Sequence, residues 1–182
     1  MTTLPRVTLR PTMLSDLDFV VGVEQDAANR PFITPWALMQ HEGAIRFPDA
    51  RHFIVELAAE RAGFVILQGC RNPNRSLELK RIVLGPKGLG VGRACVRQLK
   101  KMAFLQFGAH RFWLDVKGRN IRAHALYRSE GYVEEGRLRE CVRIEDELGA
   151  TGQPVQAYDD LIVMSLLRAE YDARVEQGLE AA

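Results

Sequence analysis

The chain has 182 residues, of which 47% are hydrophobic and 26% charged, and these values are typical of a single soluble domain. Its 25 Lys and Arg residues nearly balance its 23 Asp and Glu residues, and the net charge of +2 argues against nucleic acid as the main partner. The three Cys residues include no C-x-x-C pair, which argues against a disulfide framework and a Cys-based zinc site. The chain starts without the apolar segment of a secretory signal, and no apolar run reaches the ~18 residues of a membrane span. We therefore expect a cytoplasmic protein without a membrane partner.

The first half of the chain predicts two helices and four strands. Residues 6–10 alternate between basic and apolar side chains, as in a short strand. Ser15, followed by acidic residues, is a helix-capping signal, and Thr34 before Pro35 predicts a second helix that ends at Pro48. Strand-like runs follow at 52–58, 63–69 and 77–84, and the first two read as an antiparallel hairpin.

The second half alternates between helices and strands. The clearest helix covers residues 91–107, where an apolar stripe opposes a side rich in Lys and Arg. It is followed by a strand at 112–116, a helix at 120–130, and strands at 132–144 and 158–167. A strand–helix–strand connection implies one parallel pair, whereas the hairpins imply antiparallel neighbours.

These elements together predict an α/β fold with a twisted, mostly antiparallel sheet, one parallel crossover and flanking helices. We expect one domain over residues 1–182, with its core at about 6–167 and a C-terminal tail at 168–182.

The segment after the strand at 77–84 is rich in glycine and reads LGPKGLGVGRA. Glycines let backbone N–H groups approach a ligand, and a helix N-terminus favours negative charge, so this segment predicts a phosphate-binding turn. A Walker loop fits poorly, because Val91 and Gly92 stand where that loop has Lys and a hydroxyl. A dinucleotide fingerprint also fits poorly, because Arg93 replaces its third glycine. A glycine-rich turn that binds nothing is the structural alternative.

Residues 87–92 match a third pattern, Gln/Arg-x-x-Gly-x-Gly/Ala, with Lys87 in place of Gln or Arg. Downstream, residues 120–132 match N-x-x-A-x-x-L-Y-x-x-x-G-F/Y at every specified position. Two motifs in this order, separated by one predicted helix and one strand, resemble the GNAT N-acetyltransferase family. The resemblance covers roughly residues 6–167 and implies the GNAT fold, with acetyl-CoA as the cosubstrate.

The resemblance also implies which residues hold acetyl-CoA. The strand before the turn is expected to pair its backbone with the pantetheine arm, and the turn is expected to hold the diphosphate. Helical spacing puts Asn120, Ala123 and Tyr127 on one face of the following helix, although a helix cap and a packing alanine are alternatives for the first two. The expected cofactor-binding residues are Ile82, Val83, Leu84, Lys87, Gly88, Leu89, Gly90, Val91, Gly92, Arg93, Ala94, Asn120, Ala123 and Tyr127.

Acetyl transfer from a thioester needs a neutral amine and a proton for the departing thiolate. Tyr127 matches the family's general acid, since a phenol with a pKa of about 10 stays protonated at neutral pH. We choose Glu78 as the general base, with a surface Glu paired to Lys80 or Arg81 as the alternative. Strand alternation predicts that Glu78, Lys80 and Ile82 share one face. An α-amine, with a pKa of about 7.8 against about 10.4 for an alkylamine, needs no strong base.

The predicted activity is transfer of an acetyl group from acetyl-CoA to a primary amine of a small molecule or peptide, by direct attack in a ternary complex. Residues 135–140, EGRLRE, resemble the branch that includes ribosomal-protein N-terminal acetyltransferases, so a protein N-terminus is an alternative acceptor. A non-catalytic CoA-binding regulatory module is a second alternative.

The partners of the chain are less specified by the sequence. Phe32 and Trp36 either wall the acceptor pocket or pack in the core, and the acidic stretch at 145–147 suits a cationic acceptor or a solvated loop. The scattered His52, His110 and His124 have no metal-ligand spacing, so we expect no metal. The family resemblance leads us to expect a homodimer through the last strands.

Overall fold

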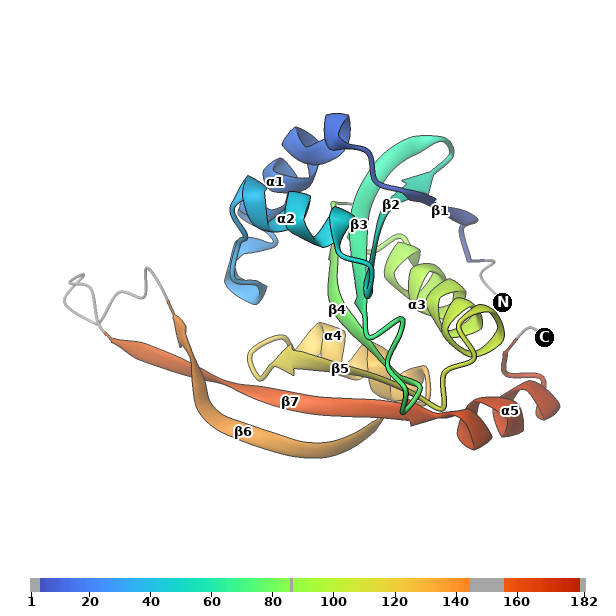
Figure 1. Cartoon of the computed structure of the whole chain (residues 1–182). Helices are drawn as coiled ribbons and strands as arrows, with labels where there is room; N and C mark the ends of the chain where they lie inside the picture. The colour runs from blue at the N-terminus through green and yellow to red at the C-terminus, as the bar shows by residue number, and fades with distance from the viewer. Residues whose placement is uncertain (1–3, 86, 145–155, 181–182) are drawn as a thin grey trace.

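The computed structural model describes residues 4–85, 87–144 and 156–180. Its seven strands form one sheet in the order β1-β2-β3-β4-β5-β7-β6, and β4 and β5 are the parallel pair (Figure 1). The predicted mixed sheet with one parallel crossover is therefore confirmed. The strands are β1 (Val7–Pro11), β2 (Ala50–Leu57), β3 (Glu60–Gln68), β4 (Ser76–Leu84), β5 (Arg111–Lys117), β6 (Val133–Ile144) and β7 (Ala157–Leu167).

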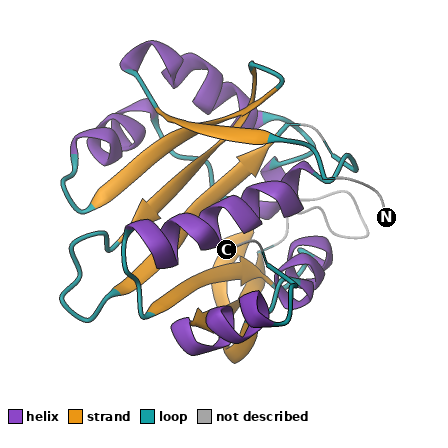
Figure 2. Ribbon diagram, turned by 90° about the vertical axis from the view of Figure 1, so that its right-hand side faces the viewer, coloured by secondary structure: helices purple, strands orange, loops and turns teal. Residues whose placement is uncertain are grey.

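Helices cover both faces of this sheet (Figures 1 and 2). The smaller apolar cluster joins Val20 and Ala44 to one face, and the larger cluster packs Leu99, Tyr127 and Tyr171 on the other. No helix in the described ranges combines the length and apolar character that a membrane crossing requires. The helices are α1 (Leu17–Gln25), α2 (Leu38–Arg46), α3 (Val91–Lys101), α4 (Ile121–Ser129) and α5 (Arg168–Glu176), with short 3-10 turns at Leu14–Asp16 and Arg30–Phe32.

The helix predicted at 91–107 divides into α3 and a π-helical turn, Met102–Gln106. The C-terminal segment then packs against this turn, because Tyr171 stacks on Phe104 with 4.6 Å between ring centroids. Glu180 also binds the fully buried Lys100. The packed core thus continues beyond Leu167, where the sequence predicted only a tail.

The prediction that Thr34 caps the second helix is wrong, since α2 begins at Leu38 with Ala37 as its N-cap. The preceding segment is held in extended form by contacts that the sequence pattern does not reveal. Its Thr34 carbonyl accepts hydrogen bonds from Arg81, and its Trp36 N–H donates to Glu24.

The parallel strands β4 and β5 pair over only three positions and then separate. The pairs are Ser76–Arg111, Leu77–Phe112 and Glu78–Trp113. The β3–β4 register shifts just beyond this stretch, since Ile66 pairs with Arg81 whereas Leu67 pairs with Leu79. This β-bulge leaves Lys80 as the extra residue and bends β4 away from β5.

The bulge also corrects the predicted alternation along β4. Leu79 and Ile82 both belong to the cluster on the α3 face, whereas Val83 belongs to the cluster beneath α1 and α2. Arg81 reaches Glu24 on α1, and Glu78 binds Lys80. Glu78, Lys80 and Arg81 therefore face α1 and α2, and Ile82 does not share their face, because the extra residue shifts the alternation by one.

Candidate active site

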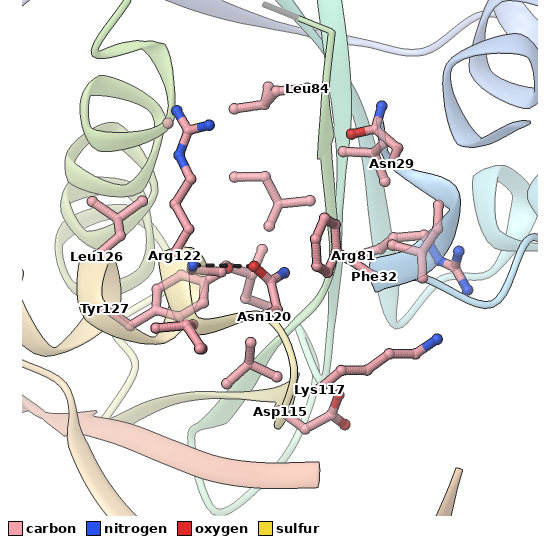
Figure 3. A pocket seen from close by; sticks show the side chains of 18 of the residues that line it. Asn29, Phe32, Arg81, Leu84, Asp115, Lys117, Asn120, Arg122, Leu126 and Tyr127 are labelled. Atoms are coloured by element: carbon pink, nitrogen blue, oxygen red, sulfur yellow. Dashed lines mark hydrogen bonds between the residues drawn. The ribbon is translucent and has the colours of Figure 1, made fainter. Parts of the chain in front are cut away.

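A cavity of about 1140 Å³ opens where β4 and β5 separate. It is lined by β4, β5, the turn before α3, the first turns of α4 and the segment between α1 and α2 (Figure 3). Of the expected cofactor-binding residues, Leu89 and Ala94 do not line it. Those that line it are Ile82, Val83, Leu84, Lys87, Gly88, Gly90, Val91, Gly92, Arg93, Asn120, Ala123 and Tyr127.

The glycine-rich turn brings backbone N–H groups and cations to one end of this cavity. Gly88 and Gly90 have φ values of 80° and 75°, and Gly90 is the N-cap of α3. Lys87 donates from Nζ to the Leu84 carbonyl at 2.9 Å and also to the Asn29 side chain. A left-handed backbone, a helix N-terminus and adjacent cations form an anion site that fits a diphosphate.

Arg93, in the first turn of α3, is held from behind by a buried carboxylate. Its Nη1 lies 3.2 Å from Oε1 of Glu130, a residue with no exposed surface. Glu130 also accepts hydrogen bonds from Arg97 at 3.0 Å and Lys100 at 2.9 Å. Burial opposes its ionisation, yet these hydrogen bonds hold the pKa of Glu130 below its usual value. The charged pair fixes the start of α3 against the end of α4.

Tyr127 reaches the cavity because Asn120 sets the start of α4. The Asn120 side chain accepts the Ala123 N–H at 3.2 Å, a capping bond drawn in Figure 3. Tyr127 lies about two turns along and is 6% exposed, with its ring against Tyr132. Burial raises the pKa of Tyr127, so its hydroxyl is a proton donor at neutral pH. For Asn120, the cap and the cavity-lining role coexist.

The candidate base Glu78 lies on the α1–α2 face but outside the cavity lining. Its Oε1 is 3.1 Å from Nζ of Lys80, and burial raises the pKa of its carboxyl. Asp115 on β5 is the carboxylate that does line the cavity, and its charge raises the pKa values of both Tyr127 and Glu78. Asp115 is not among the predicted site residues, although an acidic residue within the apolar run of β5 was the available signal.

The segment between α1 and α2 walls the other end of the cavity with Phe32, Ile33, Thr34 and Trp36. Phe32 and Trp36 thus lie on the cavity wall, and Trp36 also packs against the smaller apolar cluster, so both roles considered for it apply. Arg81 lies above the Trp36 ring, with its guanidinium carbon 4.3 Å from the ring centroid. The acidic residues Glu145, Asp146 and Glu147 lie outside the described residues.

A family model for the acetyltransferase (GNAT) family matches residues 18–132. The chain is 27% identical over 184 residues to spermidine N(1)-acetyltransferase of Vibrio cholerae, covering 94% of this chain and 98% of that protein. It is 26% identical over 144 residues to spermidine N(1)-acetyltransferase of Escherichia coli K12, covering 72% and 75% of the two chains. The crystal structure of the Vibrio cholerae spermidine N-acetyltransferase in complex with CoA and spermine matches with a TM-score of 0.74 at 26% identity, over 91% of this chain and 97% of that one.

The divided sheet, the glycine-rich turn and the buried phenol are features expected of an acyl-CoA transferase. The chain belongs to the GNAT acetyltransferase family, and it is an N-acetyltransferase that uses acetyl-CoA as its cosubstrate. No group of three or more His, Cys, Asp and Glu side chains that could hold a metal ion occurs in the described ranges.

Proposed function

We propose that the protein acetylates the primary amine of a small molecule by direct attack within a ternary complex. The observation that carries this proposal is the continuous cavity, which reaches from the first turn of α3 to the wall formed by Phe32 and Trp36. Two substrates held in one cavity can react without a covalent enzyme intermediate. Cys95 is fully buried and burial raises the pKa of its thiol to about 12, which argues against a cysteine acyl-enzyme.

In the part of the proposed site that binds acetyl-CoA, backbone groups, cationic side chains and the Tyr127 phenol have separate roles. Acetyl-CoA supplies the activated acetyl group. Backbone groups of 82–84 on the separated part of β4 pair with its pantetheine arm, and the turn at 87–94 with Arg93 holds its diphosphate. Tyr127 donates its proton to the sulfur as the C–S bond breaks and the new C–N bond forms, and this keeps the leaving group from departing as a thiolate.

Two carboxylates serve the acceptor half in this proposal. Glu78 remains the proposed general base, because burial raises the pKa of its carboxyl and makes it a better proton acceptor. Asp115 lines the cavity and binds the incoming ammonium before its proton is lost. A water molecule between Glu78 and the amine completes the proton path, since Glu78 itself is set back from the cavity.

The relatives support a small molecule as the acceptor. Two curated relatives are named spermidine N(1)-acetyltransferases, which act on a small amine rather than on a protein N-terminus. A further structural neighbour is a dodecameric spermidine N-acetyltransferase from Vibrio cholerae, with a TM-score of 0.70 at 27% identity over 92% of this chain and 97% of that one. Its assembly supports the proposal that this chain also self-associates.

Release of the CoA thiol tests the proposed function. Purified protein is given acetyl-CoA and a panel of small amines and N-terminal peptides, and the free thiol is followed with time. We expect release that depends on a small amine and that rises with its concentration. Turnover of peptides alone would move the activity to protein N-termini, and CoA binding without release for any acceptor would favour the non-catalytic module.

A further inference from the structure

Cationic side chains outnumber acidic ones among the described residues that line the cavity. Asp115 is the single acidic side chain among its described lining residues. The cationic lining side chains are those of Lys80, Arg81, Lys87, Arg93, Lys117, Arg119 and Arg122. Four of them are paired with carboxylates that do not line the cavity, namely Lys80 with Glu78, Arg81 with Glu24, Arg93 with Glu130 and Arg119 with Asp159.

These cations divide between the two ends of the cavity. Lys87 and Arg93 belong to the turn and first turn of α3, and Arg122 lies in the first turn of α4. In the proposed function, these three cations bind the phosphates of the cosubstrate. Lys80 and Arg81 lie instead on the α1–α2 face of β4. This is the side of the acceptor wall, by which we mean the cavity wall formed by residues 32–34 and Trp36.

Asp115 and Lys117 place opposite charges side by side on the acceptor half. They are two positions apart on β5, so they lie on the same face of the strand, with their backbones separated by about 7 Å. Figure 3 shows both side chains extending to the same side of β5. A small molecule with a cation and an anion a few ångströms apart matches this pair.

The remaining wall is apolar and aromatic. Phe32 is 38% exposed and lines the cavity together with Ile33 and Trp36. Trp36 is kept in place by the Arg81 guanidinium above its ring. An exposed aromatic side chain on a cavity wall favours an apolar group of a ligand.

We propose that the acceptor is an amino acid-like molecule, in which the reactive amine stands beside a carboxylate and an apolar side chain. This inference rests on the proposed function and specifies its substrate class. Asp115 binds the ammonium, Lys117 and Lys80 bind the carboxylate, and the side chain contacts Phe32 and Trp36. A polyamine, the substrate class of the named relatives, finds one carboxylate, that of Asp115, among the described lining residues.

Matched pairs of acceptors that differ only in the carboxylate test this assignment. L-phenylalanine is compared with 2-phenylethylamine and L-leucine with 3-methylbutylamine, with spermidine alongside, by CoA thiol release at fixed acetyl-CoA. We expect kcat/KM to favour the carboxylate-bearing member by about tenfold or more, as for one charge-assisted hydrogen bond. Equal values within each pair, or spermidine as the best acceptor, would overturn the inference and leave the proposed function intact. Absence of release with every amine would remove both.

The Lys117→Met variant tests whether Lys117 causes the preference for the carboxylate-bearing acceptor. The ratio of kcat/KM between the two members of a pair should fall towards one, while the KM for acetyl-CoA stays at the wild-type value. Lys101→Met is the matched control, because Lys101 is exposed on α3 and lies outside the cavity lining. An unchanged ratio in Lys117→Met, with thermal unfolding as in the wild type, would contradict the inference.

Discussion

Arg81 on β4 donates from Nη1 to Oε1 of Glu24 on α1 at 2.5 Å, across 57 positions of sequence. Glu24 has no exposed surface, and its other oxygen accepts the Trp36 N–H at 2.7 Å. Both terminal nitrogens of Arg81 also donate to the Thr34 carbonyl, each at 3.0 Å. The Arg81–Glu24 pair therefore connects the acceptor wall, through Thr34 and Trp36, to β4, the strand at which the sheet divides.

Glu24→Gln should loosen that wall without disturbing the cofactor end. Burial opposes ionisation of Glu24, but the His41 hydrogen bond and the Arg81 charge keep its pKa below the usual value, so the charged pair exists at neutral pH. We expect the acceptor KM to rise about tenfold and the acetyl-CoA KM to stay unchanged, because one charge-assisted hydrogen bond is weakened.

Steady-state kinetics with each substrate varied in turn measure this split. Glu42→Gln is the control, because Glu42 lies on α2 and pairs with Arg46 at the surface. If the two KM values rise together, Glu24 serves general stability rather than the acceptor wall. Breaking a buried ion pair costs about 3–5 kcal/mol, so thermal unfolding is recorded for both variants.

Tyr127→Phe should lower kcat while acetyl-CoA still binds. Loss of a general acid costs roughly 10²–10⁴-fold, and the ring itself continues to pack against Tyr132. Calorimetry gives the affinity for CoA, and thiol release gives kcat. Tyr158→Phe, an exposed tyrosine on β7, should behave as the wild type. Retained kcat in Tyr127→Phe would exclude the acid role.

Glu78→Gln and Asp115→Asn should separate proton removal from amine binding. Because burial raises the pKa of Glu78, its proposed action as a base predicts an acidic limb of kcat that lies above the ordinary range of Glu. That limb should vanish in Glu78→Gln. Asp115→Asn should keep the limb and raise the acceptor KM. The reverse pattern in pH–rate profiles would transfer the role of base to Asp115.

Gly90→Ala should weaken both the turn and CoA binding. At a φ of 75° a side chain costs about 1–2 kcal/mol. A Cβ there would lie 3.3 Å from the Leu4 and Pro5 side chains, so these must shift as well. Gly22→Ala, with open space around it in helix α1, should instead stabilise by about 1 kcal/mol. Urea unfolding and CoA calorimetry test the pair, and tight CoA binding by Gly90→Ala would show that the turn tolerates a side chain.

His52 should make the folded state sensitive to acid. Burial lowers its pKa from 6.5 to about 4, beside Thr12 and the buried His41. A lowered folded-state pKa gives stability that is complete above pH 6.5 and is lost as the pH falls towards 4, because the unfolded chain binds the proton first. The loss amounts to about 3 kcal/mol at roughly 1.36 kcal/mol per pKa unit.

Urea unfolding at pH 7.5 and pH 5 measures this dependence. His52→Gln should flatten the curve between these values, whereas exposed His110→Gln should follow the wild type. Parallel curves for the wild type and His52→Gln would rule out His52 as the source of the acid sensitivity.

The strands and the helices α3 and α4 could be predicted because their patterns are local. The apolar stripe of α3, the cap at Asn120 and the glycines before α3 all act within a few residues of themselves. The start of α2 could not be predicted, because the Thr34–Trp36 backbone is held by Glu24 and Arg81 from distant parts of the chain. Local capping preferences yield to such tertiary contacts.

The acceptor half was predicted less well than the cofactor half for a related reason. A β-bulge at Lys80 shifts the alternation of β4, and neither the face of Ile82 nor the setback of Glu78 can be read from a period of two. Asp115 gains its importance from the cavity that opens beside it. Its spacing to other polar residues in the chain gives no sign of that cavity.

Because β4 and β5 pair over only three positions, the sheet divides into two parts, β1 to β4 and β5 with β7 and β6, which are joined at one end. Beyond Glu78 and Trp113, β4 and β5 lack the backbone hydrogen bonds that hold neighbouring strands at a fixed spacing. A pantetheine chain bound between the two strands would take the place of these hydrogen bonds. The separated part of the sheet would then be most rigid when acetyl-CoA is bound. The amide hydrogens of residues 79–84 should therefore exchange more slowly as acetyl-CoA saturates the enzyme.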